Sequence, residues 1–175
     1  MKSLYDSKYY CYPSNNSPEP GGALLNAGTN GTQVQFPIVP PAPGSIPCSS
    51  PCPVLVRVPI DITNLSNPKV LLTFTCIISI PAGVTAITLN FLIIKTVHHH
   101  GFPQVISGPY TFSEPITAAT SQSFTFQYCD FTPTSGHSIY AVQLDPINST
   151  VSPTNTNFQI GINNVVLSAL AVESL

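Results

Sequence analysis

Charged residues are scarce in this sequence. Asp, Glu, Lys and Arg make up 7% of its 175 residues, where a soluble domain carries about 25%. A surface for nucleic acid, or a polybasic anchor on a membrane, needs a dense cluster of basic side chains. Five cationic residues cannot supply one, so the sequence predicts no nucleic-acid partner and no membrane partner. A net charge of −2 leaves little repulsion between copies, which favours a protein that associates.

Tryptophan is absent, the single methionine is the first residue, and strong helix formers are few. Thr, Ile, Val, Phe and Tyr are plentiful instead, so propensity predicts an all-β protein. No apolar run reaches the ~20 residues that a membrane helix requires. The first twelve residues hold two lysines without an apolar stretch behind them, so we expect no secretory signal peptide.

Groupings of residues that carry catalysis are also missing. The seven acidic residues are scattered, and no glycine-rich loop precedes a helix. His137, Asp145 and a serine have the residue types of a catalytic triad, but nothing in the sequence marks a nucleophile elbow or an oxyanion donor. The sequence therefore predicts neither an enzyme nor a cofactor.

Two clusters invite a metal-site interpretation. On a strand, His98 and His100 would face the same way about 6.5–7 Å apart and could share a metal with His137, yet no carboxylate lies near them to orient the imidazoles. Cys48 and Cys52 form at most half a zinc site, because the other cysteines stand alone. We expect a polar strand end at His98, His99 and His100, a local or intermolecular disulfide at the cysteine pair, and no bound metal.

The first 53 residues differ in kind from the rest. They are polar and rich in proline, with too few apolar residues for a core of their own. Within them, the alternation in 32–38 places Val34, Phe36 and Ile38 on one side of a strand that has no evident partner in this segment. We therefore predict an extended N-terminal arm over 1–53, which adds this strand to the sheet edge of a neighbouring copy.

Residues 54–175 show repeated two-residue periodicity. Strands are predicted at 54–60, 69–79, 85–96, 110–113, 121–129, 138–144 and 157–172. The last is hinged near Asn163 and Asn164, and loops are expected at 97–109 and 145–157. Seven or eight strands at this spacing are typical of a two-sheet sandwich. We expect a jelly roll first and an immunoglobulin-like arrangement second.

The five cysteines leave one without an intrachain partner. Cys11 lies among Tyr9, Tyr10 and Tyr12, aromatic residues that suit docking on another molecule, after which the thiol can be locked in place. The alternative is an inert tail. Cys76 shares its predicted face with apolar residues, so we expect a small buried side chain there, and parity places Cys129 on the opposite, polar face.

Three segments carry a resemblance to a known family: LLTFTCII at 71–78, LNFLII at 89–94 and SQSFTFQYCD at 121–130. Together with a cysteine-bearing N-terminal arm before a β-sandwich, they resemble endospore appendage (Ena-type) fibre subunits and related β-sandwich domains of spore-forming Firmicutes. In that family a jelly-roll domain polymerises into fibres on the spore surface. A connector at the N-terminus of each subunit forms disulfides with a neighbour.

The resemblance implies a structural subunit that self-polymerises into a homopolymer on the endospore surface, with a spore-coat anchor or tip protein as a further partner. It implies a cross-link from Cys11 to one of Cys48, Cys52, Cys76 and Cys129, although the family's connector often holds paired cysteines and Cys11 is single. Such proteins are made in the mother cell and freed by lysis, so they need no signal peptide. The alternatives are a spore-surface carbohydrate-binding adhesin, with Tyr110 and the histidines stacking on sugars, and an exosporium or coat lattice protein.

Overall fold

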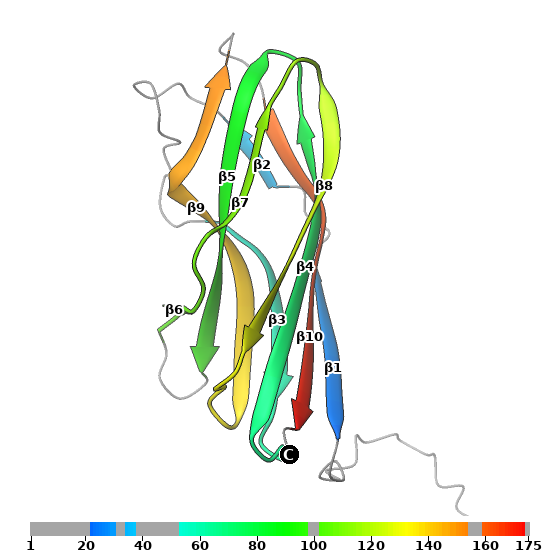
Figure 1. Ribbon diagram of the computed structural model, residues 1–175, viewed down its shortest axis with the longest axis vertical. Helices are drawn as coiled ribbons and strands as arrows, with labels where there is room; N and C mark the ends of the chain where they lie inside the picture. The colour runs from blue at the N-terminus through cyan, green and yellow to red at the C-terminus, as the bar shows by residue number, and fades with distance from the viewer. Residues whose placement is uncertain (1–21, 31–33, 38–52, 98–101, 154–158, 174–175) are drawn as a thin grey trace, which may run out of the picture.

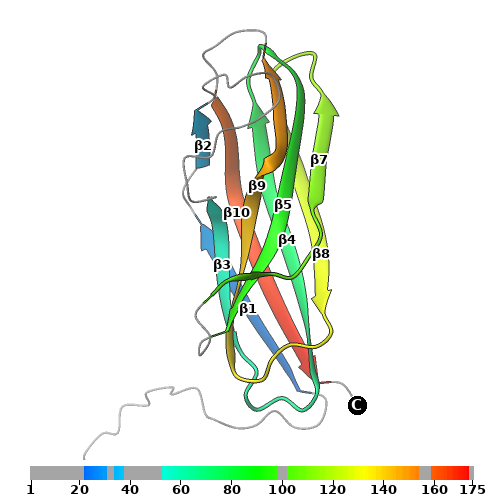
Figure 2. The same cartoon turned by 90° about the vertical axis from the view of Figure 1, so that its left-hand side faces the viewer.

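The protein is an elongated two-layer β-sandwich (Figures 1 and 2). The structure, a computed structural model, describes residues 22–30, 34–37, 53–97, 102–153 and 159–173. These residues form strands and contain no helix. The strands are β1 (Ala23–Asn30), β2 (Val34–Pro37), β3 (Val54–Asp61), β4 (Pro68–Ile80), β5 (Val84–Val97), β6 (Gln104–Val105), β7 (Tyr110–Pro115), β8 (Thr120–Asp130), β9 (His137–Pro153) and β10 (Gln159–Glu173).

The order of the strands is that of a jelly roll. One sheet runs β1-β10-β4-β8, with β2 following β1 along the same side of β10. The other runs β3-β9-β5, with β6 and β7 following one another along β5. If β1 with β2, and β6 with β7, are each counted as one strand, the two sheets read 1-8-3-6 and 2-7-4-5 in chain order. Every pairing between the strands is antiparallel. This is the double Greek-key arrangement of jelly rolls, so the first of the two predicted topologies is confirmed.

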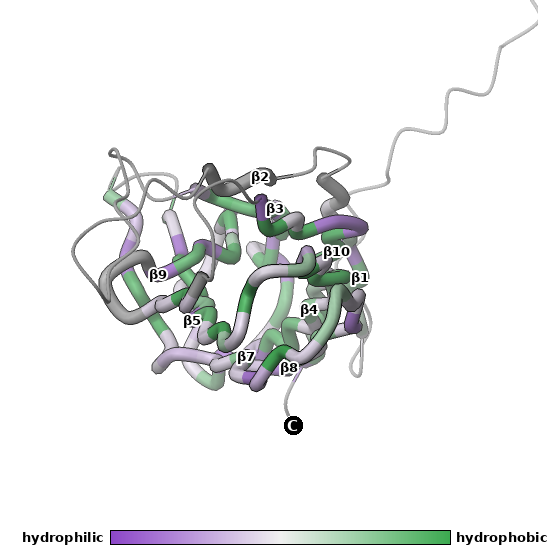
Figure 3. Tube along the Cα trace, turned by 90° about the horizontal axis from the view of Figure 1, so that it is seen from above, coloured by the Kyte–Doolittle hydropathy of each residue, from purple (hydrophilic) through white to green (hydrophobic). Residues whose placement is uncertain are grey.

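The core lies between the sheets, where the predicted alternation places it. In β4, every second side chain from Val70 to Ile78 is at most 1% exposed. The facing strand β5 contributes Ile87, Leu89, Phe91 and Ile93 in the same way. Figure 3 looks along the sandwich and shows hydrophobic residues recurring in both layers. Aromatic rings fill the centre, with Phe74 stacked on Phe126 at 4.8 Å between centroids.

The N-terminal boundary differs from the prediction. β1 and β2 pair with β10 of the same chain, so the sandwich begins at Ala23 rather than at residue 54. The predicted strand exists, but Val34 lies opposite Ile162 and Phe36 opposite Ile160, and the segment completes its own sheet. Ile38 lies outside the described residues. Periodicity identifies a strand but not its partner, and the open side of β10 becomes visible only in the folded sheet.

A glycine lets β1 approach the second sheet. A Cβ atom added at Gly28 would lie 1.8 Å from the backbone oxygen of Arg57 in β3, far inside any tolerated contact. Two residues earlier, the Asn26 side chain donates a hydrogen bond from Nδ2 to the Pro59 oxygen of β3 at 2.7 Å. The two edge strands therefore meet and close this side of the sandwich.

The predicted loop at 145–157 is also corrected, because β9 continues to Pro153. The β5–β9 register passes from Asn90 opposite Asp145 to Thr88 opposite Thr150, so β9 carries extra residues at this point. The buried Ser149 stabilises the irregularity: its Oγ accepts a hydrogen bond from the Asn90 N–H at 2.9 Å and donates one to the Asp145 oxygen at 2.5 Å. Side-chain hydrogen bonds allow this polar stretch to remain in the sheet.

The hinge predicted in the last strand is confirmed as a bulge. β10 is continuous, but its register against β4 shifts between Asn163 and Val166. Asn164 takes a left-handed backbone conformation with φ of 50°, which asparagine tolerates better than most residues.

Candidate functional site

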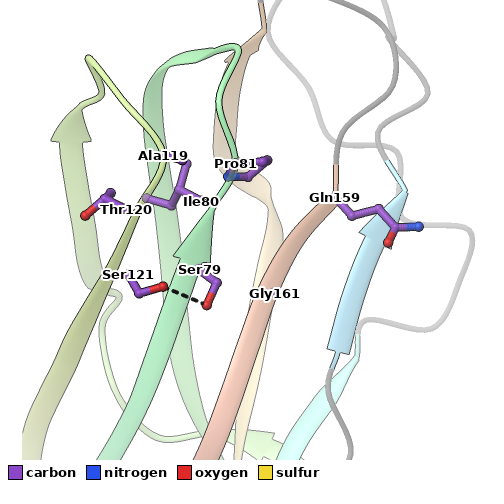
Figure 4. A pocket seen from close by; sticks show the side chains of 8 residues that line it. All are labelled: Ser79, Ile80, Pro81, Ala119, Thr120, Ser121, Gln159 and Gly161. Carbon is purple, nitrogen blue, oxygen red and sulfur yellow. Dashed lines mark hydrogen bonds between the residues drawn. The ribbon is translucent and has the colours of Figure 1, made fainter.

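An open depression of about 460 Å³ lies at one end of the sandwich, where β4 ends and where β8 and β10 begin (Figure 4). Its lining is uncharged and mixes hydroxyl, amide and apolar groups: Ser79, Ile80, Pro81, Ala119, Thr120, Ser121, Gln159 and Gly161. The hydroxyls of Ser79 and Ser121 are 3.1 Å apart, and the Asn163 side chain donates to the Ser79 oxygen at 3.1 Å. Such a surface suits a neutral partner rather than an ion.

A stripe of hydroxyl and amide side chains continues from this depression along the outer face of β4 and β8. Thr75 and Thr125 face each other with their hydroxyls 2.9 Å apart. Further along, the Gln127 side chain donates to the Thr73 hydroxyl at 3.3 Å. Cross-strand hydrogen bonds of this kind hold the side chains in place, and the stripe they form carries no charged side chain.

β8 is an edge strand without the usual protection. Among the described strands it pairs with β4 alone, and from Thr120 to Cys129 it holds no charge, no proline and no glycine. The edge strands of the other sheet are guarded, β3 by Arg57 and Pro59 and β7 by Glu114. Natural proteins use such residues to prevent edge-to-edge pairing. β8 lacks them, and the Tyr110 hydroxyl of β7 bonds one backbone oxygen of this strand, that of Gln127.

The opposite end of the sandwich mixes polar and apolar groups at its surface, and Asp61, Asn67 and Lys69 are exposed there. Here the Glu173 N–H donates to the Gly22 oxygen at 3.2 Å, so the segment 1–21 joins the domain at this end. β4 alone spans 13 residues, which puts about 40 Å between the two ends at ~3.3 Å per residue. Exposed large hydrophobic side chains gather toward this end: Leu24, Leu25, Phe102, Val105, Phe131 and Val172.

The structure assigns Tyr110 a different role from the predicted sugar contact. Its ring stacks on Phe126 at 4.0 Å between centroids and 7° between planes. Its hydroxyl donates to the Gln127 oxygen at 3.0 Å. Tyr110 thus joins β7 to β8 and closes the second side of the sandwich, and a sugar contact at this half-buried residue stays a prediction. His98, His99 and His100 lie outside the described residues.

The cysteines separate into two classes. Cys76 is fully buried in the core, and burial raises the pKa of its thiol to about 12. Cys129 is half-buried on the outer face of β8, and both are free thiols. Cys76 lies opposite Phe124 and Cys129 opposite Leu71, so five positions of β4 separate them. A fully buried thiol is out of reach of another subunit, so Cys76 is not a cross-link acceptor. Cys11, Cys48 and Cys52 lie outside the described residues.

We expect a thiol reagent to distinguish the two described cysteines. In the native protein at about pH 8, Cys129 should be alkylated while Cys76 stays unmodified, because the thiolate is the reactive species and a raised pKa suppresses it. Peptide mass mapping after labelling, with and without denaturant, measures this. Cys129→Ser serves as the control. Native labelling of Cys76 at the rate of Cys129 would contradict its placement in the core.

Within the described ranges, no three His, Cys, Asp or Glu side chains are grouped as metal ligands would be. His137, the histidine that the structure describes, begins β9 opposite Asp61. Helices long and apolar enough to cross a membrane are also absent from the described residues.

A buried ionic cluster was missed by the sequence analysis. The Lys95 Nζ lies 2.9 Å from the Asp130 Oδ2, and the Tyr140 hydroxyl donates to the same oxygen at 2.8 Å. The Thr132 N–H donates to the Asp130 Oδ1 at 3.2 Å. Lys95 is 7% exposed, Asp130 8% and Tyr140 not at all. Since β8 belongs to one sheet while β5 and β9 belong to the other, the cluster ties the two sheets together.

The electrostatics of the cluster follow from its burial. Burial and then the hydrogen bond to Asp130 raise the pKa of the Tyr140 hydroxyl, so it remains a donor. The Lys95 ammonium also lies 5.4 Å from the centre of the Tyr140 ring, within the range of a cation–π contact. The sequence held a signal for this cluster, because Lys95 and Asp130 both occupy inward positions of their strands.

Comparisons with known proteins agree with the observed domain boundary. Searches of curated proteins and of solved structures find no match. A family described as a domain of unknown function, DUF4489, matches residues 22–172, a span that begins one residue before β1 and ends one residue before the end of β10. The chain therefore belongs to the DUF4489 family.

Proposed function

We propose that the protein is a structural subunit that assembles head to tail with copies of itself. In this assembly the segment 1–21 of one copy, with the exposed hydrophobic side chains near the end where it joins the domain, docks on the uncharged depression of the next. The observation that carries the proposal is the placement of these features. Segment 1–21 joins the domain at Gly22, whereas the depression around Ser79 and Ser121 lies at the opposite end. A contact between unlike ends is heterologous, and it builds a filament unless it closes into a ring.

The chemistry of the two surfaces is compatible. Segment 1–21 carries four tyrosines, whose rings bury large apolar areas and whose hydroxyls form hydrogen bonds. The depression offers Pro81 and Ala119 to the rings and the hydroxyls of Ser79 and Ser121 to the phenol groups. Because the lining has no charged side chain, docking would leave no buried charge unpaired.

A covalent brace from Cys11 to Cys48, Cys52 or Cys129 would then make the contact permanent. The resemblance to endospore appendage subunits is the reason for placing the assembly on the spore surface, as an extracellular fibre. The revised arm is shorter than the one predicted from the sequence, because residues 23–30 and 34–37 belong to the sandwich.

A lattice protein is the second candidate, and the unguarded edge of β8 favours it. If edges of β8 pair between copies, the subunits associate side by side through backbone hydrogen bonds. The adhesin alternative lacks comparable support, because the described lining of the depression holds no aromatic side chain for a sugar ring.

Negative-stain microscopy with sedimentation velocity tests the proposal. The full chain should form filaments, and deleting residues 1–21 should leave monomers. Ala119→Arg, which places a charge in the depression, should also abolish filaments. Thr125→Arg is the matched control, since it adds the same charge in β8, outside the depression, and it should still assemble.

The paired variants separate end-to-end from side-by-side contacts. Loss of assembly in Thr125→Arg, with Ala119→Arg unaffected, would replace the head-to-tail contact by pairing along β8. Filaments formed by the chain that lacks residues 1–21 would overturn the role of that segment. A full chain that stays monomeric at high concentration would overturn the proposed function itself.

A further inference from the structure

We propose that Lys95 and Asp130 condense spontaneously into an intramolecular amide bond that joins β5 to β8. This inference goes beyond the proposed function and does not depend on it. The product would be a covalent link between the two sheets, comparable in position to a disulfide but independent of redox conditions.

The geometry places the reacting groups in contact. The Lys95 Nζ is 2.9 Å from the Asp130 Oδ2, and the carboxyl carbon is one bond beyond that oxygen. Both side chains are about nine-tenths buried, on strands held by long antiparallel ladders. Such fixed proximity replaces a bimolecular encounter, and effective concentrations of well-oriented intramolecular groups reach about 10⁵–10⁸ M.

Burial also favours the uncharged product. An ammonium and a carboxylate removed from water lose much of their solvation, and their mutual attraction often only offsets that cost. A proton transfer within the pair gives a neutral amine and a neutral carboxylic acid, the forms that react. An amide is neutral too, so the low-dielectric surroundings that penalise the ion pair do not penalise the bond.

The step balances without any co-reactant. After the proton moves from the Lys95 ammonium to the Asp130 Oδ2, the amine attacks the carboxyl carbon and a C–N bond forms. The C–O bond to Oδ2 then breaks. Oδ2, already carrying one proton, takes a second from the attacking nitrogen through the Tyr140 hydroxyl and leaves as water. Nitrogen keeps one hydrogen, Tyr140 is restored, and no oxidation or reduction occurs.

Each carboxyl oxygen of Asp130 already accepts a hydrogen bond from a donor that suits its role in the reaction. The Tyr140 hydroxyl bonds to Oδ2, the oxygen that leaves and must be protonated. The Thr132 N–H bonds to Oδ1, where negative charge develops in the tetrahedral intermediate. A backbone donor held in place at such an oxygen contributes strongly in acyl-transfer sites.

Intact mass spectrometry of the purified full chain, denatured and reduced, tests this inference. The measured mass should fall below the sequence mass by one water molecule, and peptide mapping should place the link between the segments of β5 and β8. Reduction restores the hydrogens that disulfide formation removes, so disulfides do not contribute to the measured loss of mass. The measurement is made on the separated chain, so it holds whether or not filaments form.

Three variants localise the bond. Lys95→Arg should show the full sequence mass, since a guanidinium does not take part. Tyr140→Phe keeps the ring but loses the donor, so the condensed fraction should fall. Lys69→Arg, at an exposed lysine of β4, should condense like the parent. A parent chain with its full sequence mass would overturn the inference, and so would loss of water in Lys95→Arg.

Discussion

Deletion of residues 1–21 should leave the folding of the sandwich intact, whereas deletion of residues 1–53 should abolish it. The longer deletion removes β1 and β2, the strands that pair with one whole side of β10. Roughly ten ladder hydrogen bonds at about 1 kcal/mol each would be lost. That loss is comparable to the ~5–15 kcal/mol by which a domain is stable.

Circular dichroism with thermal unfolding measures this directly. The shorter deletion should melt within a few degrees of the full chain, and the longer one should show no cooperative transition. A point variant gives the same test in the full chain. Gly28→Val should destabilise strongly, because its Cβ meets the Arg57 oxygen at 1.8 Å. Ala27→Val, at the exposed neighbouring residue, is the control. If the chain that lacks residues 1–53 melts cooperatively at the temperature of the full chain, the sandwich does not need β1 and β2, and the domain begins at residue 54 as predicted from the sequence.

The second large effect concerns the buried cluster. Lys95→Met should destabilise the domain by about 3–5 kcal/mol, because the Asp130 carboxylate would remain buried with neither an ammonium partner nor an amide bond to Lys95. Adding Asp130→Leu to this variant removes the isolated charge. The double variant should therefore resist more denaturant than Lys95→Met alone, since apolar side chains can replace a buried ion pair at little cost.

Urea unfolding, monitored by tyrosine fluorescence, gives the free energy of unfolding of each variant. Lys69→Met, at an exposed lysine of the same protein, is the control and should change stability by less than about 0.5 kcal/mol. Equal free energies of unfolding for Lys95→Met and the double variant would show that the Asp130 carboxylate does not destabilise the domain when Lys95 is absent. The cluster would then contribute little to holding the two sheets together.

The faces of the main strands could be predicted from alternation alone. Val70, Leu72 and Phe74 in β4 point inward as the two-residue period indicates. The bulge at Asn163 and Asn164 was also predicted, because asparagine pairs interrupt a strand. Extending the same parity to Lys95 and Asp130 would have indicated that both side chains point inward, but not that they meet. Their inward placement was overlooked because charges in a strand are ordinarily taken as solvent-facing.

Other features had no local signal. The segment Ala23–Asn30 is rich in Ala, Asn and Gly, which have weak strand propensity, so β1 forms because β10 offers it a partner. Polar residues beyond Asp145 were read as a loop, yet the Ser149 hydrogen bonds keep them in β9. In both cases tertiary contacts supply stabilisation that local composition does not.

The amino-acid sequence by itself determined the all-β class, the inward face of each long strand and the lack of charge on the surface, because these depend on side-chain type and a period of two residues. Only the tertiary structure decided which strands are neighbours, where the domain begins and which groups meet across the sheets. Those features depend on contacts between residues far apart in the chain, such as Gly28 with Arg57 and Lys95 with Asp130, and local pattern carries no record of such pairs.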